Sequence, residues 1–453
     1  MRRVVKVSRI RIIITIIVVV LTTLLTGCTG KEPNEIAYVV ALGIDSTDDD
    51  NYKITIQYAN TTQISGGASE SGGKAGSEIV DNVTIEAPNI YAGVGLANNI
   101  VSKSFSMSHA KLIVFSKEVA EKGVKDMIET LVRSEEIRPD VFIAVANTTA
   151  NDYLTSVNPE MEVNPAQYYQ LIYQKNQLVG IPDGQLREFF TGLYTDNYDS
   201  ILPVAGVIEG SGGNSQNDDK GQSKDSQNEG SEGSSESLDS FESKNSDENE
   251  KEKDAEKNTS KYEYDIKNYV GGETAIEKKN KAEAIGAAVF EKDKMVGELG
   301  EVETEICKML KGDYTYSYLT YYNNDTPDIP ITVKTTQQKK PKYKIDTDKK
   351  TVNIELYIES DLYSLPADYN VENKIEDFER DVANYTSSAC TEFINNFTKK
   401  YNSDILKLNE KVKYKFLTNN QYNWFKKNVG WSEYKFSVCT DFKVRRTGLI
   451  VRE

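Results

Sequence analysis

Hydrophobic and polar positions alternate or cluster along the chain in ways that predict strands. Residues 36–45 are an almost continuous apolar run, which is typical of a strand that is buried on both faces. Residues 52–60 alternate between tyrosine or isoleucine and polar side chains, so they predict a half-buried strand. A polar turn separates the two segments, and together they predict a β-hairpin.

Strands and helices then alternate as far as residue 210. The pattern predicts strands at 79–87, 109–116, 141–147 and 201–210, and helices at 88–103, at 117–133 and through most of 148–200. Ser116 is placed to cap the second of these helices. Its predicted core positions are Val119, Val124, Met127, Ile128 and Leu131.

The last third of the chain repeats these patterns. It predicts a strand–turn–strand unit at 282–300, a short helix at 302–312 that stops at Gly312, strands at 326–337, 351–360 and 434–444, and helices at 371–401 and 404–427. The helix at 371–401 carries a broad apolar stripe. We therefore expect it to lie across a sheet, although a coiled-coil arm is an alternative for so long a helix.

The pattern as a whole predicts an α+β protein with mixed β-sheets packed by helices. A length of 453 residues is enough for two to four domains, and the pattern favours two or three. Residues 36–210 form an N-terminal α+β region, which we expect to comprise two domains interrupted by a Gly/Ser loop at 61–78. Residues 282–453 form a C-terminal α+β domain.

The composition changes sharply between these two regions. Residues 211–262 consist almost entirely of Ser, Gly, Asn, Asp, Glu and Lys. Such a segment cannot bury enough apolar surface to offset its ordering entropy, so we predict a disordered acidic insert. A solvated spacer is the expected role, and a binding tract is the alternative.

The N-terminus has the features of a secretory signal peptide at 1–27. Five basic residues precede an apolar run at 12–25, which is 14 residues long; a bilayer span needs about 20. An uncleaved membrane anchor is the alternative. Residues 25–28 (LTGC) resemble the bacterial lipobox. That resemblance implies a diacylglyceryl group on Cys28, cleavage before Cys28, and a lipidated tether at 28–35.

The charge balance is acidic, with 54 Lys and Arg against 70 Asp and Glu and a net charge of −16. A nucleic-acid binder normally carries a basic footprint, so that class is disfavoured. Cleavage would remove five cations and take the net charge from −16 to −21. We therefore expect no general attraction to an anionic membrane, and the lipid would hold the protein there.

The residues do not assemble into a catalytic or metal-binding constellation. The single histidine, His109, is expected to be a packing or hydrogen-bonded residue, and no P-loop, GxSxG or HExxH motif occurs. Four glutamates precede or begin the helix at 302–312, where the helix dipole explains them: Glu298, Glu301, Glu303 and Glu305. The Asp48–Asp50 run predicts a solvated turn. Cys307, Cys390 and Cys439 are expected to be buried free thiols.

Five blocks in order resemble the Ger(x)C lipoproteins, the C subunits of germinant receptors. After the lipobox come EIAYVVALGID (35–45), LPVAGVIEG (202–210), AIGAAVFEKDKMVGELGEVET (284–304), NSDILKLNE with NWFKKNVGW (402–410 and 423–431), and FKVRRTGLI (442–450). The departure from the family is the acidic tract between the second and third blocks.

The resemblance implies a non-enzymatic subunit without cofactors, built from three α+β domains with mixed sheets. It implies a location on the outer face of the spore inner membrane, attached through the lipid on Cys28, together with an A subunit and a transporter-like B subunit. The alternative is a substrate-binding lipoprotein of an import system, which predicts two lobes around a cleft. An extracellular hydrolase ranks third, because no catalytic constellation supports it.

Overall fold

The computed structural model describes most of the two regions on either side of the acidic tract. The described residues are 13–18, 35–49, 51–59, 80–158, 162, 165–174, 180–195, 197–208, 268–274, 280–322, 330–364, 374–401 and 403–447. Cys28, most of the predicted signal peptide, the loop at 61–78 and the insert at 211–262 lie outside this set. The signal peptide, the lipidation of Cys28, the loop and the disordered insert therefore remain predictions from the sequence.

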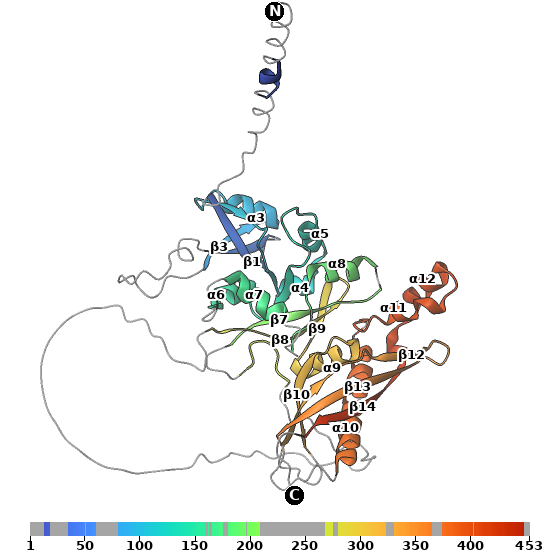
Figure 1. Cartoon of the computed structure of the whole chain (residues 1–453). Helices are drawn as coiled ribbons and strands as arrows, with labels where there is room; N and C mark the ends of the chain where they lie inside the picture. The colour runs from blue at the N-terminus through green and yellow to red at the C-terminus, as the bar shows by residue number, and fades with distance from the viewer. Residues whose placement is uncertain are drawn as a thin grey trace, which may run out of the picture. The chain divides into compact units, whose positions relative to one another are not determined.

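Nine of the described strands form one sheet in the order β3-β2-β1-β5-β6-β7-β8-β9, with β4 also paired to β1 (Figure 1). The bounds are β1 (Ile36–Ser46), β2 (Tyr52–Ala59), β3 (Val80–Ala87), β4 (Ser104–Ser106), β5 (Leu112–Ser116), β6 (Phe142–Ala146), β7 (Ile201–Val207), β8 (Ala282–Glu291) and β9 (Lys294–Leu299). The predicted hairpin is confirmed, because β1 and β2 pair antiparallel.

The centre of this sheet is parallel and its margins are antiparallel. β1, β5, β6 and β7 run parallel, whereas β8 returns antiparallel to β7 and β9 to β8. β8 and β9 follow the acidic tract in the sequence, yet they extend a sheet whose other strands precede it. The C-terminal domain is predicted to start at residue 282, which is the first residue of β8. In the structure β8 pairs with β7 of the N-terminal region, so one sheet includes strands from both predicted regions.

Helices pack on both faces of the nine-stranded sheet. One face carries α3 (Ile90–Ala97), α4 (Lys117–Lys122), α5 (Lys125–Val132) and α8 (Leu186–Thr195), and the other carries α6 (Ala150–Ser156) and α7 (Pro165–Gln174). Neighbouring residues of β5 therefore enter different cores. Ile113 packs with the first set of helices and Leu112 with the second. Burial on both faces explains why these strands are continuous apolar runs.

Two predicted helices are shorter in the structure. The helix expected at 88–103 ends at Ala97, and the helix expected at 117–133 is wrong as one element, because it divides into α4 and α5. Gly123, with φ of +121°, separates them, and the Val124 amide donates instead to Asp293 at 3.0 Å. The predicted cap is confirmed: Ser116 Oγ accepts from the Val119 amide at 3.3 Å.

Five described strands form a second sheet in the order β10-β11-β13-β12, with β14 on the other edge of β13. Their bounds are β10 (Tyr316–Tyr322), β11 (Pro330–Thr336), β12 (Lys342–Asp346), β13 (Thr351–Ser364) and β14 (Lys435–Arg446). β13 and β14 run parallel, and the other pairs are antiparallel. Both sheets are mixed and both are packed by helices, so the predicted α+β class is confirmed.

Helix α10 (Ile375–Lys400) lies along the second sheet, as its apolar stripe predicts. A polar stripe on the same helix completes the exposed edge of β14. The Asn395 side chain donates to the Phe436 carbonyl at 3.0 Å and accepts from its amide at 3.1 Å. Thr391 and Ser387 accept from the Val438 and Thr440 amides at 3.0 and 2.9 Å. The helix thus takes the place of a further strand on this edge.

The remaining helices contribute to the same core as α10. α9 (Glu301–Lys311) matches the predicted short helix, and Gly312 ends it in the left-handed conformation with φ of +84°. The helical stretch predicted at about 404–427 is divided in the structure. The structure has α11 (Leu408–Val412), the 3₁₀ turns η2 (Lys413–Lys415) and η3 (Trp431–Glu433), and α12 (Asn419–Asn428).

Candidate functional site

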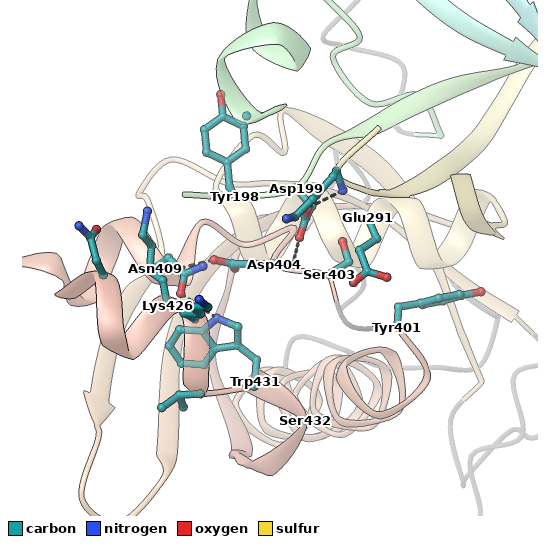
Figure 2. A pocket seen from close by; sticks show the side chains of 16 residues that line it. Tyr198, Asp199, Glu291, Tyr401, Ser403, Asp404, Asn409, Lys426, Trp431 and Ser432 are labelled. Carbon is teal, nitrogen blue, oxygen red and sulfur yellow. Dashed lines mark hydrogen bonds between the residues drawn. The ribbon is translucent and has the colours of Figure 1, made fainter. Parts of the chain in front are cut away.

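A pocket of about 600 Å³ opens where the β8–β9 turn meets the segment that follows α10 (Figure 2). Three aromatic side chains line it, together with lysines, carboxylates and small polar groups. The lining includes Tyr198, Asp199, Glu291, Lys292, Tyr401, Ser403, Asp404, Asn409, Lys426 and Trp431. The mixture of aromatic rings and charges of both signs suits a polar ligand or a peptide segment better than an apolar ligand.

Two aspartates at the base of the pocket tie its walls together. The Asp404 amide donates to Asp199 Oδ2 at 2.8 Å, and the Asp199 amide donates to the Asp404 carbonyl at 3.2 Å. The second oxygen of Asp199 accepts from the Lys292 amide at 3.0 Å. Next to them, Ser403 Oγ donates to the Phe290 carbonyl at 2.9 Å. The segment after α10 is therefore bonded directly to β8, and Asp199 links it to the turn between β8 and β9.

Asp404 also holds the first turn of helix α11 from four residues before its start. Its two carboxylate oxygens accept from the amides of Leu408 and Asn409, both at 2.8 Å. These amides stabilise the ionised form, but the side chain is only 5% exposed, and burial raises the pKa of the Asp404 carboxyl to about 7. Burial likewise raises the pKa of Asp199. Asp404 is therefore a titrating group in the neutral range, and its oxygens are already occupied by amides.

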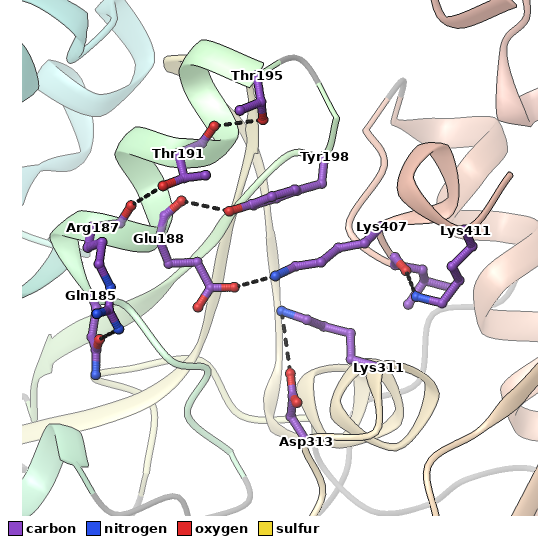
Figure 3. A network of polar contacts seen from close by, with 11 residues as sticks. Gln185, Arg187, Glu188, Thr191, Thr195, Tyr198, Lys311, Asp313, Lys407 and Lys411 are labelled. Carbon is purple, nitrogen blue, oxygen red and sulfur yellow. Dashed lines mark hydrogen bonds and ion pairs between the residues drawn. The ribbon is translucent and has the colours of Figure 1, made fainter. Parts of the chain in front are cut away.

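An ion pair lies beside the pocket (Figure 3). Lys407 Nζ is 2.7 Å from Glu188 Oε1 and 4.3 Å from the centre of the Tyr198 ring. The Tyr198 hydroxyl donates to the Glu188 carbonyl at 3.0 Å. Burial acts to raise the pKa of Glu188, but the charges of Lys311 and Lys407 outweigh it and lower that pKa. This ion pair joins α8 to the segment that leads into α11.

A second buried polar group lies on α9. Burial raises the pKa of Glu305 to about 7, and the Tyr314 hydroxyl donates to its carboxyl at 3.1 Å. Burial lowers the pKa of Lys308 to about 8, and its ammonium donates to the Ile181 carbonyl at 3.0 Å. Both side chains are tied to neighbouring groups, so this cluster fixes α9 against its surroundings.

The glutamates around the start of α9 divide into different roles. Glu301 and Glu303 lie in its first turn, where the helix dipole favours them, and Glu303 accepts from the Gly300 amide at 3.1 Å. Glu298 lies on β9 and pairs with Lys117 at 3.0 Å. The dipole interpretation is wrong for Glu298, which lies on β9, and for Glu305, which lies beyond the first turn with its half-buried carboxyl beside Tyr314.

His109 is exposed in the turn before β5, not within the strand. Its Nδ1 is 3.0 Å from Ser108 Oγ and its ring meets that of Tyr38 edge-on, with centroids 4.8 Å apart. The expectation of a packing or hydrogen-bonded residue is confirmed. Asp48 and Asp49 lie exposed in the β1–β2 turn. Across the described ranges, no three His, Cys, Asp or Glu side chains gather in a metal-binding arrangement.

The cysteines bear out part of the prediction. Cys307 and Cys390 are buried free thiols, whereas Cys439 is free but exposed, so its predicted burial is wrong. The strand pattern contains the reason, since Val438 and Thr440 of β14 face inward and Cys439 therefore faces outward. Cys28 lies outside the described residues.

Sequence reasoning missed the pocket and its aspartates. Asp404 stands in a segment predicted as helix, and Asp199 precedes β7 with no motif around it. Their proximity depends on contacts between residues about two hundred positions apart in the chain. The available signal was the short NSDILKLNE block, in which an aspartate four residues before a leucine-led helix is a possible cap.

The chain matches known families on both sides of the acidic tract. Residues 30–207 match the model described as "Spore germination protein N-terminal domain", and residues 285–448 match "Spore germination B3/ GerAC like, C-terminal".

Within the described residues, no helix combines the length and apolar character that crossing a bilayer requires.

Individual relatives match over shorter stretches. Spore germination protein KC of Bacillus subtilis (strain 168) is 26% identical over 174 residues, which are 35% of this chain and 42% of that protein. Spore germination protein B3 of the same strain is 26% identical over 148 residues, covering 30% and 36% of the two chains. The matched part thus spans about two fifths of these relatives or less.

The crystal structure of the GerBC protein aligns with a TM-score of 0.48 and 14% identity, over 89% of this chain and 96% of that chain. The two family models match in the expected order and together span most of the chain outside the acidic tract. The chain therefore belongs to the GerAC/B3-like, or Ger(x)C, family of spore germination proteins.

Proposed function

We propose that this protein is a lipid-anchored subunit of a nutrient germinant receptor, and that it acts in spore germination by binding partner subunits. The observation that carries the proposal is the match of both halves of the chain to spore germination families. The lipobox-like LTGC sequence at residues 25–28 supports attachment through Cys28. The partners in this proposal are the receptor's A and B subunits.

The candidate site supports binding rather than turnover. Both oxygens of Asp404 accept from backbone amides, and Ser403 donates to a backbone carbonyl. Neither group is poised as a nucleophile or a general base, since each is already committed to holding the fold. A pocket of about 600 Å³ next to such a rigid base is suited to receiving a segment of a partner or a small polar ligand.

Lipid attachment would raise the effective concentration of the folded domains near membrane-bound partners. Weak individual contacts would then suffice to hold the receptor in a state that responds to nutrients. The location in this proposal is the outer face of the spore inner membrane.

The test begins with Cys28→Ala and metabolic labelling by a fatty-acid probe. We expect wild type to be labelled and processed, and the variant to remain an unlabelled precursor. Cys439→Ala is the matched control, because it removes an exposed thiol and leaves Cys28 in place. Equal labelling of the Cys28 variant and wild type would contradict lipidation at this residue.

Germination is then measured in a strain whose only receptor contains this chain. Deleting the gene should abolish the response to nutrients and leave germination by receptor-bypassing agents intact. Cys28→Ala should weaken the nutrient response without unfolding the domains. Unchanged nutrient germination in the deletion strain would overturn the proposal, and loss of growth on an imported nutrient would favour the import alternative.

A further inference from the structure

The segment from α11 to α12, residues 408–428, exposes unusually large apolar side chains. We call this segment the α11–α12 hairpin. Leu417 is 94% exposed, Tyr414 is 79% exposed and Trp424 is 65% exposed. Among large hydrophobic residues of the described chain, only Ile100, at 68%, reaches the same range. Three of the four most exposed apolar side chains therefore lie on one short segment.

Folding of the hairpin does not account for these three side chains. Its inner side carries aromatic rings that join the second core, in which the ring of Phe416 lies 4.9 Å from that of Phe425 and 5.8 Å from that of Tyr422. Thr418 caps α12 by accepting from the Gln421 amide at 3.3 Å. Trp424 is next to the buried Phe425 in the helix but is itself exposed, so its exposure calls for another explanation.

The same hairpin is basic in an acidic protein. It holds one acid, Glu410, against five lysines, whereas the whole chain has a net charge of −16. The lysines are Lys411, Lys413, Lys415, Lys426 and Lys427.

Three of these lysines donate hydrogen bonds to backbone carbonyls. Lys411 donates to the Leu406 carbonyl at 2.6 Å, Lys415 donates to the Ile345 carbonyl, and Lys426 donates to the Thr195 carbonyl at 3.2 Å. Within the part of the chain that the structure describes, none of the five forms an ion pair. These bonds hold the ammonium groups themselves, and burial lowers the pKa of Lys411. The exposed lysines that a partner can reach are Lys413, Lys415 and Lys427.

We propose that the α11–α12 hairpin binds the surface of an anionic phospholipid membrane. Lysines attract the negatively charged headgroups, while exposed tryptophan, tyrosine and leucine side chains enter the interfacial layer. A protein partner would be expected to meet a continuous apolar centre with a polar rim. Here the apolar side chains are instead interspersed with cations, as in interfacial membrane segments.

This contact changes one expectation from the sequence. The acidic net charge predicts no general attraction to an anionic membrane, but a local basic surface can bind where the average charge repels. The inference adds a second contact to the lipid anchor proposed above and rests on that function only in placing the chain at a membrane. Fatty-acid labelling tests the anchor, and the vesicle experiment below tests the hairpin, so the two can fail separately.

The chain provides its own probe, since it contains two tryptophans, and Trp431 is only 7% exposed. The full chain is mixed with phosphatidylcholine vesicles with or without phosphatidylglycerol, with brominated or plain acyl chains. The fluorescence of Trp424 is obtained by subtracting the emission of the Trp424→Phe variant from that of the wild type. We expect brominated lipid to quench this difference signal in anionic vesicles and not in neutral ones.

Lysine variants sharpen the test. Replacing Lys413, Lys415 and Lys427 with alanine should lower the bound-to-free ratio of the hairpin by about a hundredfold, from about fivefold for each lysine near an anionic surface. The matched control replaces three exposed lysines outside the hairpin, Lys53, Lys125 and Lys281. It changes the net charge equally and should leave quenching unaltered.

Two results would overturn the proposal. One is equal Trp424 fluorescence in anionic vesicles with brominated and with plain acyl chains, because the side chain would then not reach the lipid. The other is equal loss of quenching in the hairpin and control triple variants, because general charge would then explain the binding. Thermal unfolding of each variant checks that its fold is retained.

Discussion

The strands of the two sheets differ in how many of their faces are buried. In the nine-stranded sheet, helices cover both faces, and every residue of β5 and β6 is buried. In the five-stranded sheet, β14 alternates between buried and exposed positions along most of its length, because α10 and the second core occupy one face. The comparison teaches that the two regions should respond differently to substitutions at neighbouring positions.

Their edges differ as well. The first sheet ends in β3 and β9, which are ordinary antiparallel margins. The β14 edge of the second sheet instead receives side chains of a helix, spaced four residues apart at Ser387, Thr391 and Asn395. Four helical residues rise about 6 Å and two strand residues about 6.6 Å, so the two periods nearly match.

The largest effect is expected from core truncation of neighbouring residues. In β5, Leu112→Ala and Ile113→Ala should each lower the free energy of unfolding by about 2–5 kcal/mol, because each empties a different core. In β14, Phe436→Ala should cost about 3–5 kcal/mol, whereas Ser437→Ala should cost less than about 1 kcal/mol. Denaturant unfolding of the four variants measures these changes in the free energy of unfolding. Similar costs at Phe436 and Ser437 would contradict the one-sided packing of β14.

A smaller effect is expected at the helix-covered edge. Asn395→Ala removes both hydrogen bonds to Phe436 and should cost about 1–3 kcal/mol, because the backbone groups lose their partners. Asn396→Ala, on the exposed side of the same helix, is the matched control and should have almost no effect. We also expect faster exchange of the Phe436 amide hydrogen in the Asn395 variant. Unchanged exchange would show that α10 does not protect this edge.

The smallest effect for a single step of one pH unit concerns the junction between the two regions and appears as a pH dependence. Burial raises the pKa of Asp404 from 3.8 to about 7, so the folded protein retains a proton that the unfolded chain releases in this range. Stability should therefore fall as pH rises from about 4 to 7, by up to about 1.4 kcal/mol per pH unit for one group. Asp404→Asn should reduce this slope.

Glu305 provides a second, independent contribution, because burial raises its pKa from 4.5 to about 7. Glu305→Gln should reduce the slope as well, and the double variant should reduce it further. The free energy of unfolding is measured by urea titration at several pH values between 4 and 7.5. A slope that neither substitution alters would refute the assignment of buried, protonated carboxyls.

Much of the local structure was predictable because one segment suffices to define it. The alternation of β14, the apolar stripe of α10 and the caps at Ser116 and Gly312 each depend on residues close together in the sequence. The pattern did not single out β10 and β12, whose tyrosine- and lysine-rich strands lack a strong apolar period. The candidate site was not predictable, since Asp199 and Asp404 carry no motif and meet only in the folded chain.

The sequence by itself determined which faces of its helices and strands are apolar, the α+β class and the blocks that resemble the Ger(x)C family. Only the tertiary structure decided which faces meet. It brought β8 and β9 into the first sheet, set the polar stripe of α10 on the edge of β14 and buried Asp404 beneath the pocket. The physical reason is that periodicity is local, whereas strand pairing, burial and the pKa values that depend on burial arise from contacts between distant segments.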